Sequence, residues 1–513
     1  MTTIFLAICE PVDYTEKRMK SLYVHIVAIT LLTVMAGWLR LAQLGDINLH
    51  DDEFYQFETA VGYLETGQFA RYNFFTQQTE GVYTRAIPFT WQVILSLHQF
   101  GYTEWAARLP AVIWGTALIP VVIISLLWLT RRSDLAYGLG WLLTFDNFFI
   151  ALSRYVRMYS MIIVLLFTLS VLVYQWLQVN DRRQRLYYGA TIVGLTLLSW
   201  FTFSELTLAW GAGIGVYIFI RTLYYRHGDA VDRTCAYVFI LGSALAVLGT
   251  GIHFAGYHII PVGAFIVRDQ PYFFYFNELF TVLQLPVLGV IFFLVGLLTL
   301  SQRNSFITFS AITSGSVLLY FIYFSHHWEA KRYIAFLLPG LYLLIVAGIG
   351  AVIRFTIQRL KLSRVSSLVV IVAAWLVFGP WLSWPGNSMQ YPLLQPAYAN
   401  FNQQQLGLPD LQRAYSYVVD HYQLGEQVFM QGPRYYYWPD HAIEIQKLGA
   451  YKSLTFEDFL ELIQAAPAGG WIVYSDNNSR HLRLQIRKYV RHHFQYQHTL
   501  FDSGVNVFHF YAI

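Results

Sequence analysis

Apolar runs of about 20 residues recur along most of this chain, and they constrain its fold more than any other feature. A helix needs a run of about that length to cross the hydrocarbon core of a bilayer. Only 12% of the residues are charged, whereas soluble domains average roughly 25%. We therefore predict a polytopic α-helical membrane protein with about 11 transmembrane helices, within a range of 10 to 13. The candidate spans are 21–42, 107–129, 135–150, 159–178, 187–203, 207–225, 236–257, 279–300, 306–325, 334–354 and 366–384.

The distribution of basic residues between the loops predicts the orientation. Clusters such as Lys17 to Lys20, Arg131 to Arg132 and Arg182 to Arg185 all lie on one side of the predicted spans. Cytoplasmic loops carry an excess of Lys and Arg, so we assign this side and the N-terminus to the cytoplasm. An odd number of crossings then places the C-terminus outside a plasma membrane.

Composition divides the chain into three predicted regions. Residues 1–20 form a cytoplasmic segment, residues 21–384 a transmembrane domain, and residues 385–513 a small extracytoplasmic α/β domain. A linker rich in Pro, Asn and Gln opens the last region, and helix-like and strand-like segments alternate after it. We interpret this domain as a lid or docking module. Cys9 and Cys235 both fall on the cytoplasmic side and indicate neither a disulfide framework nor a metal site.

Three consecutive acids, Asp51, Asp52 and Glu53, follow the first span and lie in the predicted first outer loop, residues 43–106. Helical spacing of apolar residues predicts that they begin an amphipathic helix lying along the membrane interface. Stabilisation of a helix start is a sufficient explanation for Asp51. Asp52 is expected to point away from the lipid, and carboxylates held at a membrane are more often functional. The apolar stripe consists of Phe54, Phe57, Val61 and Leu64.

Basic residues occupy the same predicted outer side. Arg154 and Arg157 precede one predicted span, and Lys331 and Arg332 precede another. Cations at outer loop ends run against the orientation bias. An anionic lipid headgroup would explain them, because Arg fits phosphate oxygens as a planar fork and Lys acts as a point charge. Snorkelling of cations to the interface is an alternative that the sequence leaves open.

The order of these motifs resembles the GT-C superfamily of polyprenyl-phosphate-sugar glycosyltransferases. It is most similar to the branch of protein O-mannosyltransferases and aminoarabinose lipid A transferases, glycosyltransferase family 39. The resemblance covers about residues 20 to 380. The resemblance rests on the acidic residues Asp52 and Glu53 and on three later segments. These segments are "RAIPFTWQVILSLHQFGYTEWAARLPA" from Arg85, "ALSRYVRMYS" and "KRYIAFLLPG".

The resemblance implies a GT-C fold and inverting transfer of a hexosyl or pentosyl unit from a polyprenyl-phosphate carrier. The acceptor would be a hydroxyl of a protein, lipid or glycan on the outer face, and no nucleic acid is expected. Asp52 matches the family aspartate and is the expected general base, with Glu53 as the second catalytic residue. A carboxylate can take the proton of an acceptor hydroxyl, and cations can stabilise the leaving phosphate. The expected substrate-binding residues are Arg85, Arg154, Arg157, Tyr159, Lys331, Arg332 and Tyr333.

A departure from the family pattern bears on metals. Many members carry a second aspartate shortly after the arginine of the second outer loop, where this chain has Tyr159. We therefore predict no metal site and no required cofactor, and a divalent metal stays open as an alternative. Four histidines near the spans lack a defined set of carboxylate partners. They are His253, His258, His326 and His327.

Two other classes of protein remain open at the level of the sequence. A transporter of lipid-linked sugars would also need outer cations and a groove, although no symmetry between the halves of the chain is evident. A non-catalytic scaffold for cell-envelope assembly would not need Asp52 to face a cavity.

Overall fold

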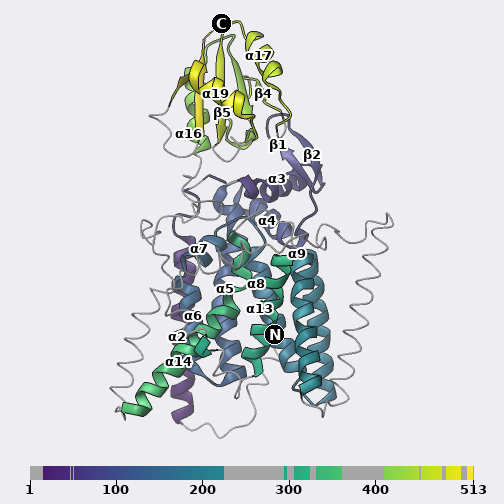
Figure 1. Cartoon of the computed structure of the whole chain (residues 1–513), viewed down its shortest axis with the longest axis vertical. Coiled ribbons are helices and arrows are strands. Elements are labelled where there is room, and N and C mark those ends of the chain that lie inside the picture. The colour runs from purple at the N-terminus through teal and green to yellow at the C-terminus, as the bar shows by residue number, and fades with distance from the viewer. Residues whose placement is uncertain are drawn as a thin grey trace.

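A bundle of helices forms one end of the molecule, and a domain with a mixed sheet forms the other (Figure 1). The computed structural model describes residues 16–46, 48–49, 51–224, 294–296, 305–323, 331–360, 410–449, 452–475, 481–497 and 505–511. The predicted spans 236–257 and 366–384, and all but three residues of 279–300, lie outside these residues. The same holds for Cys9, Cys235 and the four histidines near the spans.

Long apolar helices build the bundle, as the sequence predicts. Five of the described helices contain segments long and apolar enough to cross a membrane, and α13 contains a shorter apolar segment. The described residues therefore confirm a multi-pass helical protein, while the number of crossings stays a prediction. The bundle helices are α2 (Glu16–Leu41), α5 (Glu104–Thr130), α6 (Ser133–Phe145), α8 (Tyr159–Trp176), α9 (Arg182–Tyr224), α13 (Ser305–Tyr323) and α14 (Leu338–Leu360).

Helix α9 covers the two adjacent spans predicted at 187–203 and 207–225. Its backbone leaves the helical conformation at Phe203, where φ is −158° and ψ is 86°. Two helical segments thus meet at a kink, which agrees with the prediction of a closely joined pair.

The predicted span 135–150 is interrupted at Asp146, where α6 ends and the short helix α7 (Asn147–Ser153) begins. The Asp146 carboxylate accepts a hydrogen bond from the backbone N–H of Phe149 at 2.7 Å and so caps α7. It also accepts a hydrogen bond from the Tyr342 hydroxyl of α14 at 2.5 Å. This buried acid therefore sets the end of one helix and attaches a distant one to it.

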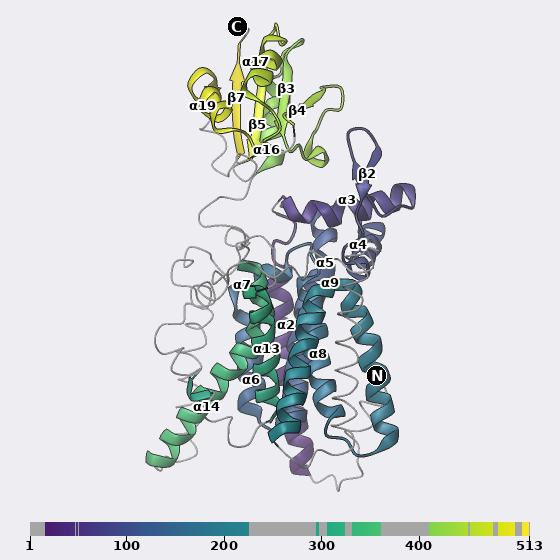
Figure 2. The same ribbon diagram turned by 45° about the vertical axis from the view of Figure 1, so that its right-hand side comes forward.

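The region between α2 and α5 contains a helix that lies across the end of the bundle, beneath the C-terminal domain (Figure 2). This is α3, close to the predicted helix. A hairpin that the sequence does not reveal follows it, and then comes a second helix. A Cβ atom on Gly62 of α3 would lie 2.0 Å from the carbonyl oxygen of Ala70, so a side chain there would prevent the hairpin from packing on α3. These elements are α3 (Asp51–Thr66), β1 (Ala70–Asn73), β2 (Gln78–Val82) and α4 (Ile87–Phe100).

The predicted lipid-facing orientation of the α3 stripe is wrong. Phe54, Phe57 and Val61 are buried inside the protein, with at most 1% of each residue exposed. Phe54 packs edge-on against Tyr437 with ring centroids 5.8 Å apart, and Phe57 contacts Tyr436 at 4.7 Å. The tyrosines come from the C-terminal domain, so the stripe is covered by a segment almost 400 residues away and not by lipid.

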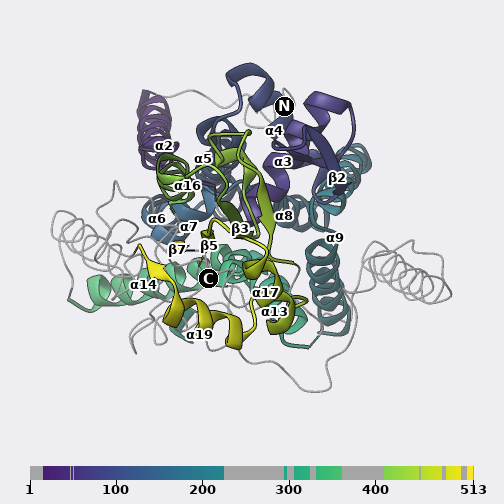
Figure 3. The same cartoon turned by 90° about the horizontal axis from the view of Figure 1, so that it is seen from above.

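The C-terminal domain contains a five-stranded sheet in the order β4-β3-β5-β7-β6. Strand β3 pairs in parallel with β4 and β5, whereas β7 pairs antiparallel with β5 and β6. Helix α16 packs on one face of the sheet, and α17 and α19 pack on the other; the view from above shows this separation (Figure 3). The elements are α16 (Leu411–His421), β3 (Gln427–Gln431), β4 (Ile445–Lys447), α17 (Phe456–Gln464), β5 (Gly470–Ser475), α19 (Leu484–His493), β6 (Gln495–Tyr496) and β7 (Val505–Phe510).

Candidate active site

Glu53, in the first turn of α3, is fully buried and forms an ion pair with Arg108 of α5. The guanidinium donates from Nε to one carboxylate oxygen at 3.1 Å and from Nη2 to the other at 3.0 Å. The backbone N–H of Val156, between α7 and α8, donates to the same carboxylate at 2.9 Å. Glu53 thus joins three segments of the chain. Its carboxylate is committed to protein contacts.

Asp52 has a different environment from its neighbour. It is half-buried, and its negative charge acts on the guanidinium of Arg157. Arg157 Nη1 lies 3.4 Å from the backbone carbonyl oxygen of Asp52 and donates to the hydroxyl of Tyr83 at 2.8 Å. Unlike the fully buried Glu53, Asp52 is therefore partly exposed to solvent and lies beside a buried cation.

Arg157 is only 6% exposed. Burial acts to lower the pKa of Arg157, but Tyr159, Tyr83 and Asp52 around it raise that pKa above its ordinary value. The guanidinium is therefore charged at all physiological pH values. Its Nε atom is buried and has no hydrogen-bond partner within the described part of the chain. A charged donor without a partner in such a position fits an anionic ligand.

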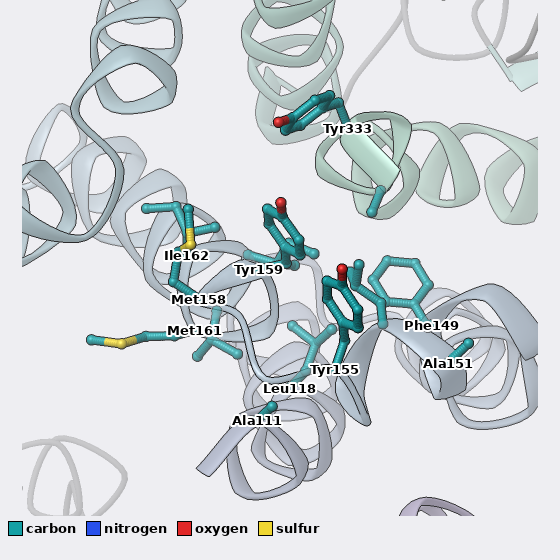
Figure 4. Packing of buried hydrophobic residues seen from close by; sticks show 14 of the residues in the cluster. Ala111, Leu118, Phe149, Ala151, Tyr155, Met158, Tyr159, Met161, Ile162 and Tyr333 are labelled. Atoms are coloured by element: carbon teal, nitrogen blue, oxygen red, sulfur yellow. The ribbon is translucent and has the colours of Figure 1, made fainter. Parts of the chain in front are cut away.

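Tyrosines connect Arg157 to the segment before α14. Tyr159 lies with its ring centroid 6.0 Å from the Arg157 guanidinium carbon and stacks on Tyr155 at 6.2 Å. The ring of Tyr333 meets the ring of Tyr159 edge-on, with centroids 6.1 Å apart. In the close view, Tyr159 lies between Tyr333 and Tyr155 (Figure 4). The structure therefore brings together Asp52, Arg157, Tyr159 and Tyr333.

Tyr333 belongs to the 3₁₀ helix η2 (Lys331–Phe336), which also carries the two predicted donor-binding cations. The side chains of Lys331 and Arg332 lie outside the described part of the chain. Their predicted role stays a prediction, although η2 is placed next to Tyr159 through Tyr333.

Two further predicted residues lie around this cluster. Arg154 is 1% exposed, and its Nη2 donates to the backbone carbonyl of Gln43 at 2.9 Å. It contacts the turn after α2. Arg85 is exposed, and its charge opposes the rise in the pKa of Tyr83 that burial causes. Arg85 thus lies near the residue that accepts from Arg157.

The C-terminal domain rests directly on the loop that carries Asp52. The Tyr437 hydroxyl accepts a hydrogen bond from the backbone N–H of Leu49 at 2.6 Å, and the Tyr436 hydroxyl donates to the carbonyl of Tyr102 at 2.7 Å. The guanidinium of Arg434 lies 4.6 Å from the ring centroid of Phe54, a cation–π distance. The C-terminal domain, which the sequence predicts to be a lid or docking module, therefore contacts α3 within two residues of Asp52.

Sequence reasoning did not anticipate the partners of the acids. Arg108 lies in the "AARLPA" part of the motif that begins at Arg85, and a charged residue at the start of an apolar span must find a buried partner. Arg40, in the last turn of α2, is likewise a charged residue within an apolar span. Arg40 is fully buried and donates to the carbonyl of Leu143 at 2.9 Å. No local pattern marks Tyr83 or Arg434.

The described residues contain no group of three or more His, Cys, Asp or Glu side chains placed to hold a metal ion. The predictions that no metal and no cofactor are needed stay predictions.

Comparisons with known proteins agree with this architecture. The fold is similar to ArnT from Cupriavidus metallidurans in the apo state, with a TM-score of 0.56 and 11% identity over 95% of this chain and 98% of that one. It is also similar to the apo oligosaccharyltransferase of Archaeoglobus fulgidus, with a TM-score of 0.56 and 10% identity over 89% of this chain and 70% of that one. A form of that enzyme tethered to an acceptor peptide has a TM-score of 0.52 and 11% identity, covering 93% and 74%. A comparison with curated protein sequences gives no match.

The helical bundle with its C-terminal domain thus has the fold of the GT-C membrane glycosyltransferases. Residues 27–199, about a third of the chain, match the model of the dolichyl-phosphate-mannose-protein mannosyltransferases. The resemblance inferred from the sequence motifs is confirmed as a similarity of the fold and of this segment of the sequence. The matched segment contains the acidic loop, Arg108, Arg157 and Tyr159.

Proposed function

We propose that this protein transfers a sugar from a polyprenyl-phosphate carrier to an acceptor hydroxyl, with Asp52 as the general base. The carrying observation is the pairing of a half-buried Asp52 with a buried Arg157 whose Nε lacks a partner within the described residues. A base and an anion-binding donor thus lie side by side. The matched family is named for a dolichyl-phosphate-mannose donor, which is a sugar on a polyprenyl phosphate.

In the proposed reaction, the acceptor oxygen attacks the anomeric carbon while the Asp52 carboxylate takes its proton. The bond between that carbon and the carrier phosphate oxygen breaks, and its electron pair leaves on the phosphate. Attack opposite the leaving group inverts the anomeric configuration. Arg157 stabilises the charge that develops on the phosphate, and Lys331 and Arg332 of η2 contribute further positive charge.

Glu53 acts in this proposal as a positioning residue. Its carboxylate is closed off from solvent by Arg108 and Val156, so it fixes the first turn of α3 on which Asp52 stands. Tyr159 and Tyr333 line the site beside Arg157. They supply aromatic surface for a sugar or an isoprenoid unit. No cofactor takes part in these steps.

The face of the bundle that carries α3 and the C-terminal domain is proposed to be extracytoplasmic, with the N-terminus in the cytoplasm. The acceptor is a hydroxyl of a protein, lipid or glycan, and the sugar is a hexose or a pentose.

The test is turnover by the purified full-length protein with a panel of polyprenyl-phosphate sugars and candidate hydroxyl acceptors. We expect release of polyprenyl phosphate that depends on both substrates and is lost in Asp52→Asn. Release that is equal in the wild type and in Asp52→Asn would contradict the role of Asp52. A chain that consumes no donor in the panel but carries one across vesicles would be a transporter.

A further inference from the structure

A polar cavity of about 170 Å³ lies between the β1–β2 hairpin and the C-terminal sheet, apart from the cluster around Asp52. The hairpin projects toward the C-terminal domain (Figure 2), and the amino group of Lys447 on β4 lies 3.7 Å from the Glu80 carboxylate on β2. The volume is roughly ten times the 15 Å³ that one water molecule needs. The cavity therefore has room for a small polar molecule, and two distant parts of the chain form its walls.

Gln431, at the end of β3, lines this cavity and is only 5% exposed. Its Nε2 donates to the carbonyl of Gly449 at 3.2 Å, which fixes the orientation of the amide. Its Oε1 is buried and has no hydrogen-bond partner in the described structure. A buried acceptor without a partner is costly, so its place in a cavity wall indicates a ligand that donates a hydrogen bond.

The charges in the wall are nearly balanced. Arg71, Arg434 and Lys447 face Glu58 and Glu80, three positive groups against two negative ones, which leaves a formal charge of +1. Glu58 is 8% exposed and accepts from Arg71 Nε at 3.0 Å. Burial raises the pKa of Glu58, although Arg434 and Arg71 act to lower it. Such a wall offers alternating donors and acceptors and favours a ligand rich in hydroxyl groups over a strong anion.

Aromatic side chains complete the site. Tyr72 of the hairpin and Tyr435 of the C-terminal domain both line the cavity. Tyr435 also stacks on Phe75 with ring centroids 5.4 Å apart, which holds the two walls together. A tyrosine ring offers a flat apolar surface with a polar tip, which suits the mixed faces of a pyranose or furanose ring.

We propose that this cavity binds a sugar unit of the acceptor, making the saccharide part of the acceptor the feature that the C-terminal domain and the hairpin recognise together. The assignment of the bound sugar to the acceptor rests on the proposed transferase function. The binding of a sugar rests on the cavity alone. Arg434 lines the cavity and also lies over Phe54 of α3. A sugar held there would order the contact between the C-terminal domain and the helix that carries Asp52.

The experiment measures binding of a panel of methyl glycosides to the purified full-length protein in detergent, by saturation-transfer NMR and titration. The panel contains hexosides, pentosides, N-acetylhexosaminides and glucuronides. Two variants probe the cavity, Gln431→Leu and Glu58→Gln. The matched control is Gln427→Leu, on the same strand, whose amide contacts the carbonyl of Ala465 outside the cavity.

We expect at least one neutral glycoside to bind the wild type and to bind both cavity variants about tenfold more weakly, as the loss of a buried hydrogen bond predicts. The control should bind as the wild type does. No binding by any glycoside, binding by glucuronides only, or equal binding by all variants would overturn the sugar site.

Donor turnover separates this inference from the proposed function. Donor consumption that depends on an added hydroxyl acceptor and on Asp52, together with no glycoside binding, would leave the transferase proposal standing and refute the sugar site. Glycoside binding with the expected variant pattern, in a protein that consumes no polyprenyl-phosphate sugar, would refute the transferase proposal and the acceptor role while the sugar site stands.

Discussion

Glu53 and Arg108 form an ion pair that is closed to solvent on both sides, with Nη2 and Oε2 3.0 Å apart. The adjacent residue, Asp52, is half-buried and lies beside Arg157 instead. Two neighbouring acids on one helical turn therefore have different surroundings. Glu53 is held in a buried contact with Arg108, whereas Asp52 is partly exposed and lies beside the buried cation Arg157.

Replacing Asp52 by Asn should lower turnover by about 100- to 10,000-fold, because it keeps the shape and removes the base. The variant should still fold and bind donor. Asp51→Asn is the matched control, since it changes the adjacent acid and should cost at most a helix cap, about 1 kcal/mol. Transfer rates at equal protein concentration show which of the two variants loses more activity. Near-normal turnover of Asp52→Asn would contradict the assignment of Asp52 as the general base.

Breaking the buried pair should destabilise the protein. Glu53→Gln or Arg108→Met leaves an uncompensated buried polar group or charge, which typically costs about 3–5 kcal/mol for a buried pair. The double variant Glu53→Leu with Arg108→Met should lose less stability than either single variant, since no charge remains buried. Apparent melting temperatures in detergent measure this order. Single variants as stable as the wild type would show that the pair does not hold α3.

Changes at Arg157 should affect the use of donor. Arg157→Ala should raise the donor KM more than Arg157→Lys, because Lys keeps the charge while both lose the planar fork. Tyr83→Phe is the control, since it removes only the hydroxyl to which Arg157 donates at 2.8 Å. Equal donor KM values in all four proteins would remove Arg157 from the donor site.

The stability of the folded protein should depend on pH because of Glu58. Its folded pKa is raised, chiefly by burial, so the folded state favours the protonated form. The stability that this proton contributes is present below the unfolded value of about 4.3 and is lost as the pH rises through the folded value. Glu58→Gln stays neutral, so its melting temperature relative to the wild type should increase as the pH rises. A difference that is constant or falls with pH would contradict the shift.

Thiol labelling in intact cells tests the proposed orientation. A cysteine at Leu424, which is 99% exposed in the C-terminal domain, should react with an impermeant reagent. A cysteine at Arg183, at the start of α9, should react only after lysis. Cys9 and Cys235 are replaced by Ser in both proteins. Labelling with the opposite pattern would place the candidate active site in the cytoplasm.

Local sequence patterns were sufficient to predict most of the described bundle helices and the α/β character of the C-terminal domain. Length and apolarity of a run decide whether a segment can span a bilayer, and periodicity decides whether a short segment is a helix or a strand. Both are local properties. The spans that became α2, α5, α8 and α13, and the alternation of helices and strands in the C-terminal domain, could therefore be predicted from residues close together in the chain.

The contacts that each of these elements makes became known only from the three-dimensional fold. The stripe of α3 looked suited to lipid, but Tyr436 and Tyr437 cover it. Arg108 could have faced any partner, and the fold placed it on Glu53 and left Asp52 beside Arg157. The physical reason is that a side chain's pattern shows what kind of surroundings it needs, whereas packing across distant segments selects which group supplies them. The contact between Leu49 and Tyr437 spans 388 positions of the chain, and no local pattern encodes it.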